Sequence, residues 1–356
     1  MKSLIVASTR EGAGKTSMLV GLASVLDQRF GYIKPLGDRF LYRKKRLWDY
    51  DAALFAHLLE LDQEPEKMSI GFDHSKLRFM YDRVSMFEEL RRMLGVVGAG
   101  RDAVFIECGK DLSYGASVCL DPLTISQETG NPVVIVASGA EDEIADDVAF
   151  IQRFVSSEEA TVAGIIVNKV IHVDDFKEVH LPEIAELGVE VLGVVPYDKE
   201  LTTMTVSLVA DRLFARVVAG EEGLGNLVRN VAVGAMSVAA AMAEERMRAP
   251  EKLVITSGDR SDMILAAIDA GGTSAVVLTN NILPPAQVMS KASEKKIPLL
   301  LVPGDTYSVA MQVERIEPLL TASEAKKAEK IRQLVAEHVD VRALAALLMG
   351  EAKRGQ

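Results

Sequence analysis

The chain is poor in cysteine and in basic residues, and each scarcity excludes a class of protein. Two of its 356 residues are cysteines, Cys108 and Cys119, which is too few for the disulfide framework of a secreted scaffold and fits a reducing cytoplasm. Basic residues are outnumbered 40 to 51, so the net charge is −11 and the pI is near 5.1. This balance argues against binding to nucleic acid or to an anionic membrane, because both need a basic face.

Long apolar runs are also missing. The alanine-rich run 231–243 is too short and too weakly apolar to span a bilayer. A predicted strand follows Met1 almost at once, so we expect no signal peptide. These features predict a soluble, cytoplasmic protein with no membrane partner.

Aromatic residues are scarce as well, at 5%, although hydrophobic residues make up 49% of the chain. A composition rich in Gly, Ala, Val and Leu but poor in aromatics is typical of α/β proteins. The length is sufficient for two domains, each with a core of its own.

The strongest motif lies near the start of the chain, where a strand, a glycine-bearing loop and a helix follow one another. Residues 3–7 are apolar and partly β-branched, as in a buried parallel strand. The loop ends in Gly14-Lys15-Thr16, and apolar residues then recur at helical spacing. Such a loop and the amino end of its helix bind phosphate groups. The residues predicted to contact a nucleotide here are Thr9, Arg10, Glu11, Gly12, Ala13, Gly14, Lys15, Thr16 and Ser17.

Two side chains of this phosphate loop have predicted roles. Lys15 can reach the β- and γ-phosphates, and Thr16 offers a hydroxyl to Mg²⁺. The loop is a variant of the Walker A pattern, because Thr9 stands where that pattern has glycine.

Charged residues follow several predicted strands, at the edge where open α/β folds bind ligands. Lys34 follows the second short strand, and Glu107 ends a buried strand, where P-loop enzymes keep a carboxylate for Mg²⁺. Asp51 begins a predicted helix, so its carboxylate is either an N-cap or a Mg²⁺ ligand. The basic stretch 39–46 is either a solvated loop or a patch for an anionic substrate or phosphate.

An Asn-Lys pair, Asn168-Lys169, follows the predicted strand 164–167. A pair at this position commonly contacts the nucleotide base in P-loop proteins. Guanine-binding proteins add an aspartate two residues after the lysine, and Ile171 stands there in this chain. ATP is therefore favoured over GTP.

Strands and helices alternate again in the second half, which predicts a smaller α/β domain without a phosphate loop. Two polar loops follow predicted strands and are expected to line one cleft, with Asp259, Arg260, Asp305 and Thr306 as ligand-binding residues. A charged helix with an apolar stripe follows from Glu324, which is typical of a docking face. We expect domains at 1–207 and 208–320 and a helical tail at 321–356.

The first half resembles the dethiobiotin-synthetase-like P-loop family, and the second half resembles the DRTGG domain. In the first half the resemblance rests on the loop Thr9 to Thr16, Lys34-Pro35, Asp51-Ala52, Glu107 and Asn168. In the second half it rests on Gly258 to Asp262, Ala275 to Asn281 and Asp305-Thr306-Tyr307. This pair, in this order, is similar to the N-terminal regulatory region of long bacterial phosphotransacetylases, over about residues 1–320.

The resemblance implies a fold and a set of roles. It implies a P-loop parallel sheet with helices on both faces, followed by the DRTGG domain. Lys15 and Thr16 would bind phosphates and Mg²⁺, and Asp51 and Glu107 would complete the metal site. Lys34 would face the γ-phosphate and substrate, which makes Lys15 and Lys34 the candidate catalytic residues, and Asn168 would contact adenine.

Some residues depart from the two families. Ser8 and Arg10 replace residues typical of true dethiobiotin synthetases, and Asn280-Asn281 replace a glycine pair of the DRTGG family. The leading hypothesis is a cytoplasmic sensor or regulator that binds ATP and Mg²⁺, with a DRTGG domain that pairs subunits into a homodimer or binds a second small molecule. The alternative is a ligase that activates a carboxylate with ATP. The acetyltransferase domain would follow this region, so we do not expect acetyl transfer from this chain by itself.

Overall fold

The computed structural model describes residues 2–43, 45–155, 161–321 and 324–349. The chain divides into two compact units, one formed by 1–198 with 320–356 and the other by 199–319. The C-terminal segment, which we expected as a separate tail, thus belongs to the first unit. In the described part of the chain, no helix combines the length and apolarity that crossing a bilayer requires.

The first unit contains a parallel β-sheet with the strand order β2-β5-β1-β6-β7-β8. The strands are β1 (Ser3–Ser8), β2 (Phe30–Ile33), β5 (Ala103–Glu107), β6 (Val133–Ala137), β7 (Val162–Val170) and β8 (Val191–Pro196). Each central strand is an almost continuous apolar run, because both faces of the sheet are covered. The carboxyl ends of β1, β2 and β5 lie side by side, and this edge carries the phosphate loop, Lys34 and Glu107.

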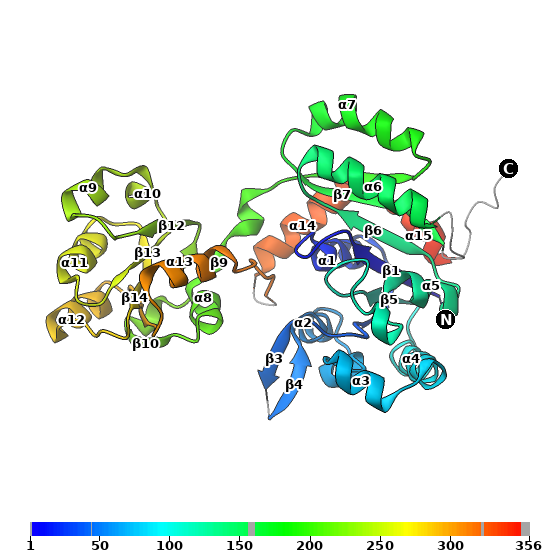
Figure 1. Ribbon diagram of the computed structural model, residues 1–356, viewed down its shortest axis with the longest axis horizontal. Coiled ribbons are helices and arrows are strands. Elements are labelled where there is room, and N and C mark those ends of the chain that lie inside the picture. Colours follow the sequence, from blue (N-terminus) through cyan, green and yellow to red (C-terminus); the bar gives the residue numbers. More distant parts are fainter. Residues whose placement is uncertain (1, 44, 156–160, 322–323, 350–356) are drawn as a thin grey trace. The chain divides into compact units, whose positions relative to one another are not determined.

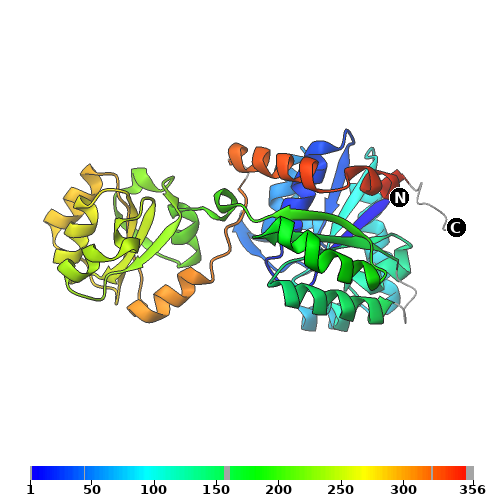
Figure 2. The same cartoon turned by 90° about the horizontal axis from the view of Figure 1, so that it is seen from above.

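Helices cover both faces of this sheet (Figure 1). One face packs against α4 (Arg83–Val97), α5 (Pro122–Thr129), α6 (Glu141–Val155) and α7 (Val173–Glu186), and their apolar residues form one core with alternate strand residues. The other face carries α1 (Lys15–Val25), α14 (Ala325–His338) and α15 (Val341–Met349), as Figure 2 shows. The fold class expected for the first domain is therefore confirmed.

Helix α14 packs closely against α1. A Cβ atom added at Gly21 would lie 2.3 Å from Val335 Cγ2, so only glycine allows this approach. Leu334 and Val335, which belong to the apolar stripe predicted from the sequence, are buried. The stripe therefore docks on the chain's own first unit.

Smaller elements complete the edge of the first unit that carries the glycine-bearing loop. The hairpin β3 (Phe40–Arg43) and β4 (Arg46–Asp49) leads into α2 (Tyr50–Leu58). Phe55 of α2 stacks on Tyr32 of β2, with ring centroids 4.1 Å apart. The short helices η1 (Pro65–Met68), α3 (His74–Met80) and η2 (Ala116–Val118) lie in the remaining connections.

The second unit is a smaller α/β unit with the strand order β10-β15-β14-β13-β12. Its sheet consists of β10 (Arg216–Ala219), β12 (Asn230–Val233), β13 (Lys252–Ser257), β14 (Thr273–Thr279) and β15 (Leu299–Leu301), with β10 antiparallel at the edge. The helices α9 (Val238–Ala243), α10 (Glu245–Arg248), α11 (Ser261–Asp269) and α12 (Ala286–Glu294) contribute to the core on one face. The helices α8 (Val206–Arg212) and α13 (Thr306–Glu314) do so on the other face, and β9 (Met204–Thr205) pairs with β11 (Leu227–Val228) beside them.

Candidate functional site

The phosphate loop connects β1 to α1 in a conformation that requires glycine. Gly12 and Gly14 have φ angles of 75° and 102°, in the left-handed region that favours glycine. Gly14 is the N-cap of α1, and no side chain caps the first turn within this fully described loop. The first-turn N–H groups of α1 are therefore available to an anion.

Lys15 is held inside the loop. Its ammonium donates a hydrogen bond to Ser8 Oγ at 2.7 Å, and the Lys15 side chain is buried. Burial lowers the pKa of Lys15, and the nearby Glu107 carboxylate opposes this shift. Ser8 was noted in the sequence only as a departure from a family pattern, and the structure shows that it positions this lysine.

Glu107, at the end of β5, lies beside the loop helix. Its Oε1 accepts a hydrogen bond from Thr16 Oγ1 and its Oε2 accepts one from Tyr32 Oη, both at 2.9 Å. Burial raises the pKa of Glu107 to about 7, and the charge of Asp51 adds to the shift. Thr16 and Glu107 are thus in direct contact, and Asp51 is close enough for its charge to act on Glu107. The metal-binding role that the resemblance implies for these three residues stays a prediction.

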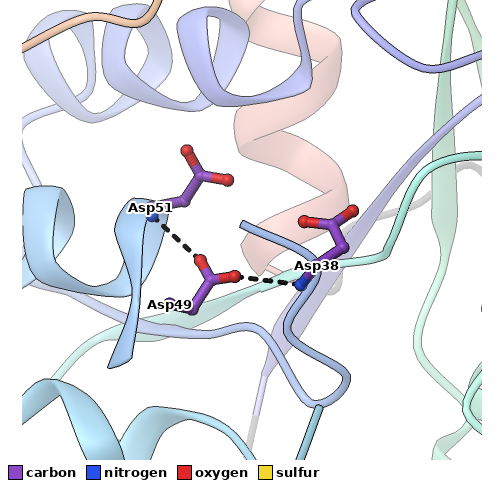
Figure 3. Close-up of side chains that lie close together, drawn as sticks. All are labelled: Asp38, Asp49 and Asp51. Carbon is purple, nitrogen blue, oxygen red and sulfur yellow. Dashed lines mark hydrogen bonds between the residues drawn. The ribbon is translucent and has the colours of Figure 1, made fainter. Parts of the chain in front are cut away.

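Lys34 contacts the carboxylates of three aspartates, Asp38, Asp49 and Asp51. Figure 3 shows how these three aspartates lie together. Its Nζ is 2.7 Å from Asp51 Oδ2 and 3.6 Å from Asp49 Oδ2, and it also pairs with Asp38. Burial would lower the pKa of Lys34, but the carboxylates, with Asp51 foremost, raise it well above its usual value. Lys34 is 1% exposed, so its ammonium is a buried counter-ion here rather than a group open to a substrate.

Asp49, which the sequence analysis missed, organises this acidic cluster. Its Oδ1 accepts the N–H groups of Asp51 and Ala52 at the start of α2, and its Oδ2 accepts those of Asp38 and Arg39. The N-cap of α2 is therefore Asp49, and the N-cap alternative for Asp51 is wrong. Burial raises the pKa of Asp49 to about 6 against the effect of Lys34.

Arg39 joins the acidic cluster to the phosphate loop. Its Nη1 lies 3.2 Å from both carboxylate oxygens of Asp51 and 3.4 Å from Thr16 Oγ1. Burial alone would raise the pKa of Asp51, but Lys34 and Arg39 outweigh burial and bring it to about 2. Arg46, also from the basic stretch 39–46, pairs with two glutamates: Glu66 lies in η1, and Glu64 is the residue just before η1.

Asn168 and Lys169 lie against the phosphate loop. Asn168 Nδ2 donates to the carbonyl oxygen of Ala13 at 2.8 Å, and Lys169 Nζ donates to that of Gly12 at 2.6 Å. A Cβ atom at Gly14 would lie 2.3 Å from Asn168 Nδ2, so glycine is required for this contact too. The pair therefore supports the loop backbone.

Arg10 and Glu11 form ion pairs with residues outside the loop. Arg10 pairs with Glu143 at 2.6 Å and Asp147 at 2.7 Å, both on α6, and Glu11 pairs with Lys110 at 3.3 Å. The side chains of these loop residues border a hollow of about 350 Å³. Its lining consists of Thr9, Arg10, Glu11, Asp111, Leu112, Ser113, Asp147 and Phe150.

In the second unit, the two predicted loops lie at the carboxyl edge of the sheet. Arg260 pairs with Asp262 at 3.0 Å and also bonds to the carbonyl of Met236, whereas Asp305 caps α13 by accepting the N–H of Ser308. Thr306 Oγ1 is 2.9 Å from Thr279 Oγ1, which connects this loop to β14.

The two residues after Thr279 adopt a left-handed backbone conformation, which favours glycine. Asn280 and Asn281 have φ angles of 62° and 54°, a region that asparagine tolerates better than most residues. Asn280 Nδ2 lies 3.4 Å from the Oγ atom of Ser257, the last residue of β13, two positions before Asp259. The structure thus places Asp259 and Arg260 on one loop and Asp305 and Thr306 on another, and Thr279 and Asn280 lie between them.

Two family descriptions match successive parts of the chain. Residues 2–205 match an AAA domain, and residues 208–316 match the DRTGG domain.

Curated relatives are phosphate acetyltransferases, and the chain is similar to their N-terminal region. The protein from Nitrosomonas europaea is 23% identical over 361 residues, which cover 95% of this chain and 50% of that protein. The protein from Pseudomonas putida is 25% identical over 371 residues, covering 96% and 51%. The chain spans about half the length of the curated relatives it matches.

Two solved structures show weak likeness. The CBS and DRTGG domains of the regulatory region of Clostridium perfringens pyrophosphatase, complexed with the activator diadenosine tetraphosphate, give a TM-score of 0.29 at 16% identity. That match covers 39% of this chain and 61% of the other. A ParA family ATPase from Chlorobium tepidum gives a TM-score of 0.35 at 14% identity, covering 56% of this chain and 86% of the other.

Proposed function

Because the chain belongs to the AAA domain family through residues 2–205, we propose that it binds ATP with Mg²⁺ and acts as a cytoplasmic regulatory or sensing protein. The observation that carries the proposal is the loop itself, in which the buried ammonium of Lys15 lies beside the uncapped first turn of α1. Positive charge and free N–H groups at one point form a phosphate site.

The metal site would be formed by Thr16, Asp51 and Glu107. Hydroxyl and carboxylate oxygens are the ligands that Mg²⁺ prefers in proteins. Thr16 bonds directly to Glu107, and Arg39 links Thr16 to Asp51. A bound Mg²⁺ would neutralise phosphate charge next to Lys15.

The environment of Lys34 favours regulation over the alternative, an ATP-dependent carboxylate ligase. A ligase of that type would need Lys34 to face the γ-phosphate and the substrate, but Lys34 is fully buried among Asp38, Asp49 and Asp51. Arg39 and Arg46, from the stretch that would receive an anionic substrate, are already paired with carboxylates. Steady phosphate release that one metabolite accelerates would support the ligase, whereas tight ATP binding with negligible turnover would support the regulator.

The second unit would bind a second small molecule and pair two subunits. Its candidate ligand residues are Asp259, Arg260, Asp305 and Thr306, on two loops at one sheet edge. Exposed apolar side chains stand near the ends of the same strands, including Tyr307 and Leu283. Apolar side chains in such a position are commonly buried across a two-fold axis.

Calorimetry with the full chain tests nucleotide binding. Replacing Lys15 by alanine removes charge-assisted contacts to phosphate that are typically worth about 1.5–3 kcal/mol, so ATP affinity should fall roughly tenfold or more. The control is Lys177→Ala, which changes an exposed lysine on α7 and should leave the affinity unchanged. Equal ATP affinity in wild type and Lys15→Ala would refute the proposal.

A further inference from the structure

Arg39 occupies a position among oxygen atoms that would suit a metal ion. Its Nη1 is 3.2 Å from both Asp51 oxygens and 3.4 Å from Thr16 Oγ1, and Thr16 is in turn bonded to Glu107. These are the oxygens to which the proposed function assigns Mg²⁺. Because Mg²⁺ binds its ligands at about 2.0–2.1 Å in a near-octahedral shell, an ion on Asp51 and Thr16 leaves no room for the guanidinium.

The charge balance explains why a cation is needed there in the absence of ligand. Asp51 and Glu107 are both buried, and two buried carboxylates at one site repel each other unless a positive charge lies nearby. Lys34 already neutralises the side of Asp51 that faces Asp38 and Asp49. Arg39 supplies the positive charge on the side that faces the phosphate loop.

Exposure distinguishes the two cations. The Lys34 side chain is 1% exposed and is surrounded by carboxylates, whereas the Arg39 side chain is 20% exposed. Arg39 is the residue just before the hairpin β3–β4. A guanidinium that reaches its partner from the surface can return to solvent at little steric cost, but a buried ammonium cannot. Arg39 is therefore the exchangeable cation of the pair.

We propose that Arg39 is an internal cation that holds the metal position in the nucleotide-free protein and withdraws when metal and nucleotide bind together. The inference rests on the proposed function and adds a regulatory element to it. Free divalent metal alone should bind weakly, since it must displace Arg39 without the help of phosphate contacts. Removal of the guanidinium should create a metal site that no longer needs nucleotide.

Binding of Mn²⁺ alone to the full, nucleotide-free chain tests this, with free Mn²⁺ followed by electron paramagnetic resonance. In Arg39→Gln, Mn²⁺ should bind about tenfold or more tightly than in wild type, the scale on which a nearby opposite charge shifts equilibria at a carboxylate. The matched control is Arg46→Gln, from the same basic stretch, whose arginine pairs with Glu64 and Glu66. That variant should bind Mn²⁺ as wild type does.

A second variant locates the metal. In the double variant Arg39→Gln with Asp51→Asn, the gain in Mn²⁺ affinity should disappear. If Arg39→Gln does not fold, Arg39→Lys takes its place, and its Mn²⁺ affinity should lie between that of wild type and the gain of about tenfold expected for Arg39→Gln. Equal Mn²⁺ affinity in wild type and Arg39→Gln, or a gain that survives Asp51→Asn, would overturn the proposal. ATP binding by wild type is measured separately, so a chain that binds no ATP would refute the proposed function while the Mn²⁺ series still decides the position of Arg39.

Discussion

Replacing Lys34 by methionine should destabilise the first unit strongly. The substitution keeps most of the side-chain volume but removes the cation that faces Asp38, Asp49 and Asp51. Removing one partner of a buried ion pair costs about 3–5 kcal/mol. We expect the lower end, about 3 kcal/mol, because Asp51 keeps Arg39 and Asp49 keeps its backbone N–H donors.

The loss should depend on pH in a defined direction. In wild type, the pKa of Asp51 is about 2, below its usual value, so its contribution to stability is present above that usual value and is lost as pH falls toward 2. Without Lys34, the carboxylates lose their main counter-ion and their folded-state pKa values rise. The deficit of the variant should therefore be larger at about pH 8 than at about pH 5.

The chain offers a local probe for this measurement. Its single tryptophan, Trp48, lies on β4 next to Asp49, so urea unfolding followed by tryptophan fluorescence reports on the first unit. Lys177→Met, on the surface of α7, is the matched control and should change the free energy of unfolding little. A loss below about 1 kcal/mol for Lys34→Met, equal at both pH values, would show that Lys34 does not neutralise this cluster.

Three further outcomes are expected. Glu107→Gln should weaken ATP binding in the presence of Mg²⁺ but not in its absence. In wild type, the gain in ATP affinity that Mg²⁺ provides should increase from about pH 6 to pH 8, because the pKa of Glu107 is about 7 and its carboxylate is ionised at the higher pH. Calorimetry that finds equal losses with and without Mg²⁺ would remove Glu107 from the metal site. Asn168→Ala should weaken ATP and GTP binding by the same factor, because Asn168 supports the backbone at Ala13; a changed preference between the two nucleotides would show that it contacts the base. The fragment 199–319, a compact unit with a core on each face of its sheet, should be folded and dimeric in light scattering, and a monomer at high concentration would contradict the proposed assembly.

Much of the first unit could be predicted from short-range sequence patterns. The strand at residues 3–7 and the loop at Gly12 and Gly14 were located because continuous apolar runs and a glycine-rich turn are local signals. The burial of the C-terminal stripe was also signalled, since amphipathic helices dock through their apolar side. The surface on which the stripe docks was not predicted, because nothing in the sequence near Gly21 indicates that α14 packs against α1 there.

The site was harder to predict, because its contacts join residues distant in sequence. Glu107 and Asp51 were predicted as site residues from their positions at a strand end and a helix start. The role of Arg39 was not identified, because one arginine among the eight residues of a basic stretch carries no local sign of pairing with a buried aspartate. Asn168 shows the opposite case, in which a motif position is occupied as expected but the side chain bonds to the loop backbone.

The charges around the phosphate loop explain why metal and nucleotide would bind together. Asp38, Asp49, Asp51 and Glu107 surround the site, and a triphosphate would bring more negative charge next to them. Lys15 supplies a single positive charge, which alone cannot offset the charges of a triphosphate and of these carboxylates. If Arg39 withdraws without replacement, Asp51 and Glu107 face the phosphates with one cation fewer, which costs free energy in a site of low polarity. A divalent ion that arrives with the nucleotide replaces the lost charge and adds one more positive charge. The exchange of Arg39 for the metal therefore favours binding of metal and nucleotide together over binding of either ligand alone.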